Sequence, residues 1–82
     1  MNTDAIEKKW TARVEKLLIG RKIVAVRYMS SDEAQEFDWY CRPITIHLDN
    51  GLVLCPAADD EGNNGGALFT DDEKMPVIPV MR

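Results

Sequence analysis

Residues 42–59, RPITIHLDNGLVLCPAAD, carry the clearest structural signal in the sequence. Apolar and polar residues alternate on both sides of Asn50-Gly51, a pair that tolerates the positive φ angles of a tight turn. The sequence therefore predicts a β-hairpin with a two-residue type I′ turn. The register that follows gives one continuous apolar face, in which Leu48 opposes Val53, Ile46 opposes Cys55 and Ile44 opposes Ala57.

A helix and a strand are predicted before this hairpin. Asp4 and Glu7 form a capping-box-like start and Gly20 supplies a C-cap, so residues 4–19 should form an amphipathic helix. Its apolar residues recur at helical spacing, namely Ile6, Trp10, Val14, Leu17 and Leu18. The β-branched run KIVAVRYMS then predicts a strand over residues 22–29, with one face formed by Val24, Val26 and Tyr28.

Shorter elements complete the predicted architecture. Ser30 and Glu33 form a second capping box, which predicts one helical turn before the aromatic residues Phe37, Trp39 and Tyr40. GALFT is a short strand candidate, and two prolines restrict the C-terminal MPVIPVMR to an edge or partly paired strand. We therefore expect one mainly β (α+β) domain over residues 1–82. Its N-terminal amphipathic helix should pack on a small five-stranded antiparallel curled sheet or an SH3-like or Sm-like barrel.

Composition is that of an ordinary globular protein. The 82 residues are 45% hydrophobic and 29% charged, which fits neither a disordered chain nor a secreted disulfide scaffold. The chain has no long apolar run and no signal-peptide pattern, so we expect a cytoplasmic protein without membrane association. A domain this small has a narrow stability margin, which self-association would widen, so we expect a homo-oligomer.

Charge is unevenly distributed along the chain. Residues 1–30 carry seven Lys and Arg against three acids, whereas residues 31–82 carry three against eleven. The basic side chains of the helix fall largely on its outer side, where they form either a solvated face or a docking surface for an acidic partner. The acidic strand region argues against nucleic-acid binding, apart from weak phosphate contacts through the basic helix face, Arg21, Lys22 and Arg27.

The segment DDEGNNGG, residues 59–66, raises the question of a metal loop. A calcium loop that starts at Asp60 would place Gly65 sixth and Asp71 twelfth, but Gly62 and Leu68 would then occupy ligand positions. Adjacent acids also oppose a phosphate site. The simpler interpretation is a solvated turn, and the metal alternative uses Asp59, Asp60, Asn64 and Asp71 as ligands.

Catalytic chemistry has few candidates. His47 is the single histidine, Cys41 lies six residues away on the same predicted strand, and the predicted register places Cys55 on the opposite face. The two cysteines have no CxxC spacing and are out of alignment for a disulfide, so we expect reduced thiols and no zinc site. No catalytic residue and no cofactor is predicted, and a non-enzymatic protein is favoured.

The segments RPITIHLDNG, P-x-x-DDEGN and GALFT resemble a small family of uncharacterised bacterial proteins. In that family a basic-aliphatic strand such as GRKIVAVRYMS precedes an Arg-Pro hairpin and an acidic glycine-rich segment. The resemblance covers roughly residues 18 to 80. It implies a bacterial intracellular protein of unassigned function, and no catalytic or binding residue carries over from it.

Two functional hypotheses follow. The first is a non-enzymatic binding or protein-interaction module with an unknown protein partner, and its candidate partner-binding residues are Trp39, Tyr40, Arg42, Asp59, Asp60 and Glu61. The aromatic residues either form core or an exposed binding patch. The alternative is a divalent-metal-binding protein that uses the acidic loop, residues 59–71.

Overall fold

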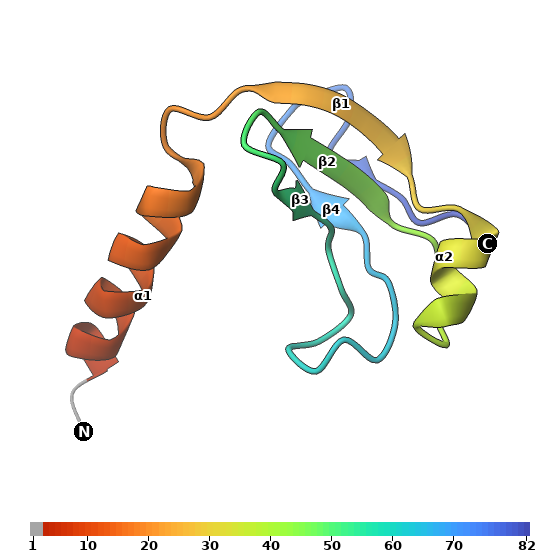
Figure 1. The fold of residues 1–82 in the computed structure, drawn as a ribbon, viewed down its shortest axis with the longest axis horizontal. Helices are drawn as coiled ribbons and strands as arrows, with labels where there is room; N and C mark the ends of the chain where they lie inside the picture. The colour runs from red at the N-terminus through yellow and green to blue at the C-terminus, as the bar shows by residue number, and fades with distance from the viewer. Residues whose placement is uncertain (1–2) are drawn as a thin grey trace.

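A computed structural model describes residues 3–82 as a small α+β fold. The elements in chain order are α1 (Thr3–Leu18), β1 (Ile23–Tyr28), α2 (Ser31–Glu36), β2 (Ile44–Leu48), β3 (Val53–Leu54), β4 (Leu68–Phe69) and β5 (Val77–Ile78). An antiparallel sheet has the order β1-β2-β3, and β4 pairs with β5 in a second sheet (Figure 1). The predicted α+β class is confirmed, but within residues 3–82 the strands divide between two sheets and no barrel closes.

The β2–β3 hairpin exists, but its predicted register is wrong. Ile46 pairs with Leu54 and His47 with Val53, so the pairs of Leu48 with Val53, Ile46 with Cys55 and Ile44 with Ala57 do not form. The turn has three residues, because the Leu48 amide donates to the Leu52 carbonyl oxygen at 2.9 Å. Gly51 has φ +87° and takes the left-handed position that such a loop requires.

This one-residue change in register determines which side chains of the hairpin lie on the same face of the sheet. The observed register continues a row of apolar side chains across the sheet, from Val26 on β1 through Ile46 on β2 to Leu54 on β3. The predicted two-residue turn would have turned Leu54 to the opposite face, beside His47, because side chains alternate along a strand. The longer turn therefore keeps the aliphatic residues of three strands together.

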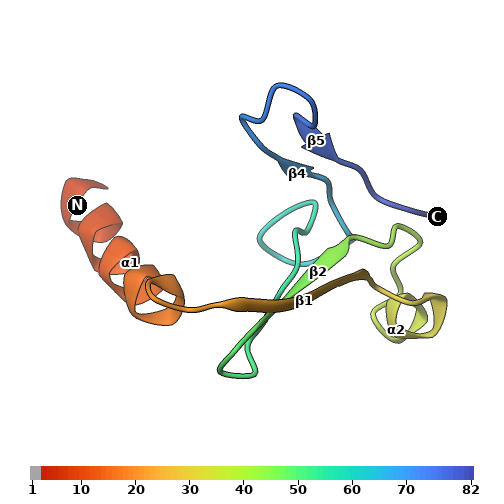
Figure 2. The same cartoon turned by 90° about the horizontal axis from the view of Figure 1, so that it is seen from above.

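Helix α1 forms as predicted, but the expectation that it packs on the sheet is wrong. All residues from Thr3 to Leu18 are exposed, and the helix stands apart from both sheets in two perpendicular views (Figures 1 and 2). The radius of gyration is 14.5 Å, whereas a compact domain of this length would have about 12 Å. Within residues 3–82, no other part of the chain covers the apolar side of α1.

The segment between α1 and β1 explains why the helix stands away. Gly20, with φ +81°, ends the helix, and the Arg21 amide donates to the Leu18 carbonyl oxygen at 3.2 Å. The next residue is tied to the β2–β3 turn, since the Asp49 amide donates to the Lys22 carbonyl oxygen at 2.9 Å. A connection this short and this constrained fixes where α1 leaves the edge of the sheet.

The core lies beneath α2. Met29, Ala34 and Trp39 form a buried cluster. The predicted capping box is confirmed, because Ser30 Oγ accepts from the Glu33 amide and Glu33 Oε1 accepts from the Ser30 amide. At the other end of α2 the Trp39 amide donates to the Ala34 carbonyl oxygen at 2.8 Å, which places the indole over the helix that precedes it.

The C-terminal segment is an edge, as its prolines predict. Beyond the β4–β5 pairing, Arg42 and Met81 form an isolated antiparallel bridge. The Tyr28 hydroxyl donates to the Pro79 carbonyl oxygen at 2.9 Å and ties the same segment to β1. The C-terminus therefore lies across the end of the three-stranded sheet rather than within it.

Glu33 makes stability depend on pH in acid. Arg27 donates to both carboxylate oxygens of Glu33, at 2.8 and 2.9 Å, and this pairing, with the Ser30 bonds, lowers the Glu33 pKa from 4.5 to about 2. As the pH falls, Glu33 binds a proton in the unfolded chain before it does so in the folded chain. Its contribution to the free energy of unfolding is therefore full above pH 4.5 and is lost as the pH falls towards 2.

We predict that the free energy of unfolding falls less steeply over this pH range in Glu33→Gln than in the native chain. Urea unfolding followed by circular dichroism at several pH values would measure the two slopes. The side-chain carbonyl oxygen of the glutamine still accepts from the Ser30 amide, so the comparison keeps the capping box and removes only the titrating carboxyl group. Equal slopes would contradict the prediction.

Candidate functional site

A cavity of about 260 Å³ lies beside α2. Its lining contains three of the predicted partner-binding residues, Trp39, Tyr40 and Arg42, together with Ser31, Ala34, Gln35 and Arg82. The predicted residues Asp59, Asp60 and Glu61 are not among the lining residues. Ser31, Gln35 and Arg82 were not predicted, because only folding brings α2 and the C-terminal segment to the same place.

Trp39 and Tyr40 have opposite environments despite their adjacency. Trp39 is 9% exposed, and its Nε1 donates to the Gly62 carbonyl oxygen at 2.7 Å. The Phe37 ring lies 5.2 Å from the indole, centroid to centroid. Tyr40 is 70% exposed. Trp39 therefore belongs to the core, and Tyr40 presents its ring to solvent.

Arg42 is held by the backbone around it. Its Nη1 donates to the Met29 carbonyl oxygen at 3.1 Å, and its Nη2 donates to the Arg82 carbonyl oxygen at 3.3 Å. Its own backbone exchanges two hydrogen bonds with Met81. These contacts use the guanidinium to join three chain segments, so its first role is in the fold of the cavity wall.

The acidic loop, residues 59–66, is held together by its own side chains. Asp59 Oδ1 accepts from the Glu61 amide at 2.9 Å and from the Asn63 amide at 3.2 Å, while Oδ2 accepts from Asn63 Nδ2 at 2.8 Å. The bonds from Asn63, the side-chain amide first, hold the Asp59 pKa below its usual value. Its carboxylate therefore closes a turn instead of projecting towards a bound ion.

The same loop packs closely on residues 41–43. Asn64 Oδ1 accepts from the Cys41 amide at 3.1 Å and from the Gly65 amide at 2.9 Å. A Cβ atom on Gly65 would lie 2.6 Å from Pro43 Cδ and 2.7 Å from the Cys41 carbonyl oxygen. Gly65 is required because the backbones approach too closely for any side chain. The loop thus fastens two distant parts of the chain together.

The proposed metal ligands are not brought together. Among residues 3–82, no three His, Cys, Asp or Glu side chains lie where they could hold one ion. Asn64 is occupied by the Cys41 and Gly65 amides. Asp71 lies in the β4–β5 turn, where its neighbour Asp72 accepts from the Lys74 and Met75 amides. Both acidic segments use carboxylates to close turns.

His47 and Cys55 do not form a catalytic pair. The observed register removes the argument that placed Cys55 on the face opposite His47. His47 Nε2 instead lies 3.1 Å from Thr45 Oγ1, and burial raises the pKa of the Cys55 thiol. A nucleophilic cysteine needs a lowered pKa, so this environment works against activation.

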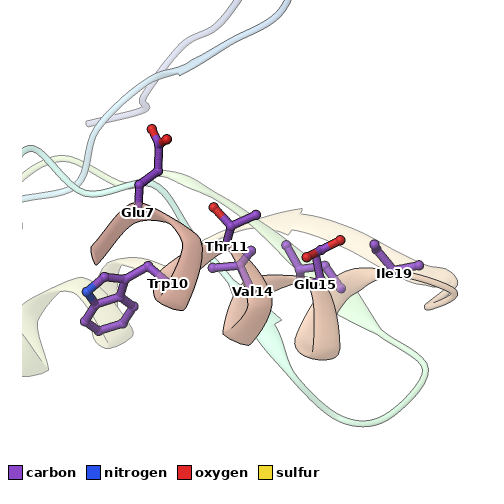
Figure 3. Close-up of a pocket in the computed structure, with 7 residues that line it drawn as sticks. Glu7, Trp10, Thr11, Val14, Glu15 and Ile19 are labelled. Carbon is purple, nitrogen blue, oxygen red and sulfur yellow. The ribbon is translucent and has the colours of Figure 1, made fainter. Parts of the chain in front are cut away.

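Five apolar side chains on one side of α1 are exposed, and we define them as the apolar face of α1: Ile6, Trp10, Val14, Leu17 and Leu18. Trp10 is 59% exposed, and the Arg13 guanidinium carbon lies 5.4 Å from its ring centroid. A shallow depression of about 410 Å³ runs along this side of the helix (Figure 3), lined by Glu7, Trp10, Thr11, Val14, Glu15, Leu18 and Ile19.

The sequence predicted these apolar residues but not that they would be exposed, because an amphipathic pattern does not show which surface covers the apolar side of a helix. The short connection from Gly20 to Lys22 was the feature that could have indicated a helix held away from the sheet.

The two adjacent aromatic residues should differ in their effect on stability. We predict that Trp39→Ala lowers the free energy of unfolding by about 3 kcal/mol, because it opens a cavity and leaves the Gly62 carbonyl unpaired. Tyr40→Ala should change it by less than about 0.5 kcal/mol. Urea denaturation of both variants provides the comparison, and similar losses for the two would contradict the assignment of Trp39 alone to the core.

The acidic loop offers a second matched pair. Asp59→Ala removes an acceptor of three hydrogen bonds and should lower the midpoint of thermal unfolding more than Asp60→Ala. Millimolar Ca²⁺ or Mg²⁺ should not raise the midpoint of the native chain above its value in EDTA. A saturable rise with one of these ions would restore the metal hypothesis.

Comparison of the chain with protein-family models, with curated proteins and with solved structures found no match. Within residues 3–82, neither helix has the length and apolarity needed to cross a bilayer. Two surfaces of the described residues can carry a function, namely the cavity beside Tyr40 and the apolar face of α1.

Proposed function

We propose that this protein is a non-enzymatic protein-interaction module whose recognition element is the apolar face of α1. The observation that carries the proposal is that this face is exposed along the whole helix. Single apolar residues on a protein surface are ordinary. A continuous stripe of five, on one side of one helix, is typical of a surface that binds another protein.

The energetics of a lone helix support this proposal. An isolated helix of 16 residues is only marginally stable in water, because most helical stability in proteins comes from packing of the apolar side. In the described part of the chain, no other element provides such packing for α1. Covering the stripe would therefore stabilise α1 and bury apolar surface in the same step.

The residues of α1 suit recognition in a groove. A helix that binds this way presents anchors at spacings of three and four residues, which Ile6, Trp10, Val14 and Leu17 do. Trp and Arg are enriched among the residues that dominate binding energy, and Trp10 carries Arg13 beside its ring. The helix also carries Lys8, Lys9 and Lys16, so a partner with an apolar groove and an acidic rim is complementary.

The surface around Tyr40 is a secondary contact in this proposal. Tyr40 is exposed beside a cavity whose walls are fixed by Trp39 and Arg42. Asp60 and Glu61 are exposed on the acidic loop and suit a basic segment of a partner. The proposal retains the cytoplasmic location and the absence of a cofactor that the sequence favours.

Site-specific photo-crosslinking tests this function. A photoreactive phenylalanine analogue at Val14 should give a discrete protein adduct in cells that produce the chain, because position 14 lies in the apolar face. The control position is Ala12, which lies on the opposite side of the same helix turn. Adducts from neither position, or equally from both, would contradict the proposal.

A further inference from the structure

We infer that the surface which covers α1 is the sheet groove of a second copy of this chain, so that two copies exchange their helices. The sheet groove is a depression of about 250 Å³ lined by Ile46, Leu54, Cys55, Pro56 and Leu68. The inference depends on the proposed function, since it names the partner that the apolar face of α1 binds.

The sheet groove has the chemistry that α1 requires. Its floor is the aliphatic row of Ile46 and Leu54, which Val26 extends to the sheet edge. Val26 is 59% exposed, and Ile46, Leu54 and Leu68 are half-buried. The chain therefore contains two uncovered apolar surfaces of different shape, a convex helix and a concave sheet.

A chain cannot place its own helix on its own groove in the observed arrangement. The residues between Leu18 and Ile23 are held against the β2–β3 turn by the bond between the Asp49 amide and the Lys22 carbonyl oxygen. Arg21 Nη1 also lies 4.0 Å from Asp49 Oδ1. Short, constrained connections of this kind favour exchange of an element between identical copies.

The excess surface of the chain matches what a stable dimer buries. The accessible surface is 6606 Å², whereas a compact monomer of 9.3 kDa would expose about 5,000 Å². Covering the excess of about 1,600 Å² on each of two copies would bury about 3,200 Å², within the range of obligate homodimers, roughly 2,000 to 5,000 Å².

Charge favours the contact of helix with sheet over the contact of helix with helix. Residues 1–30 have seven basic side chains and three acidic ones, while residues 31–82 have three and eleven. Within this division α1 itself carries four basic and three acidic side chains, while residues 19–82 carry six and eleven. Contact of α1 with the body of another copy therefore places a weakly basic helix against an acidic body. A dimer with two-fold symmetry then contains two equal helix–groove contacts. No α1 helix or groove is left free to bind a third copy.

Complementation of two variants tests the exchange. Val14→Asp places a charge in the apolar face of α1, and Val26→Lys places a charge in the apolar row next to the sheet groove, beside Ile46. Each charge would have to be buried in the proposed contact. We expect the native chain to be a dimer by light scattering after gel filtration. Each variant alone should dissociate with a dissociation constant at least roughly a hundredfold higher. An equimolar mixture should recover a dimer, because each variant keeps the half that the other lost.

Ala12→Asp is the matched control, since it adds the same charge to the opposite side of α1 and should leave the native dimer intact. A dimer in which Val14→Asp dissociates while Val26→Lys does not would mean that α1 pairs with α1, which overturns the exchange but not the interaction function. A monomeric native chain whose position 14 crosslinks to a different protein would likewise overturn the exchange but not the interaction function. A monomer without any adduct overturns both.

The native fold gives an independent check if Val26→Lys fails to fold by circular dichroism. The photoreactive residue at position 14 should then be mapped on the purified chain. Crosslinks to residues 23–28, 44–55 or 68 of a second copy support the exchange. Crosslinks to residues 3–18 overturn it.

Discussion

Gly65 lies closer to Pro43 and Cys41 than a residue with a Cβ atom could, and the packing around Trp39 uses this close approach. It lets the acidic loop lie against the start of β2, where Asn64 pairs with the Cys41 amide and the Gly62 carbonyl pairs with the Trp39 indole. Pro43 is fully buried there. These bonds position Trp39 against Ala34 and Met29, so the loop closes the core beneath α2. An acidic, glycine-rich segment that suggests ion binding is used instead to join backbones.

The buried residues of the described chain lie between positions 29 and 65, and α1 contributes none of them. The helix is joined through a short segment bound to the β2–β3 turn, and its apolar face is left exposed. A marginally stable domain of 82 residues leaves this much apolar surface open only at a cost in free energy. Association that covers the surface removes that cost, which is why the function proposed for this chain is binding.

Local features were predictable from the sequence, and features that depend on distant contacts were not. The start of α2 was predicted from the capping box of Ser30 and Glu33, and α1 was predicted from the helical spacing between Ile6 and Leu18. Both signals act within a few residues of the chain. Asn50-Gly51 correctly marked a turn, but glycine at φ +87° fits a three-residue loop as well as a two-residue one. The three-residue turn is favoured because it aligns Val26, Ile46 and Leu54 on one face of the sheet. That alignment could not be predicted without knowing the order of the strands. The gathering of Trp39, Tyr40 and Arg42 was suggested by their adjacency, whereas Ser31, Gln35 and Arg82 join them only through the fold.

If a second copy covers α1 as proposed, the helix should be more stable in the associated chain than in the separate one. Amide hydrogen exchange of the native chain from micromolar to millimolar concentration would measure this difference. Protection of the α1 amides should rise with concentration, together with that of Val26 and Leu54, while amides of α2 stay constant. Protection of α1 that is the same at every concentration, whether high or absent, would contradict the proposal.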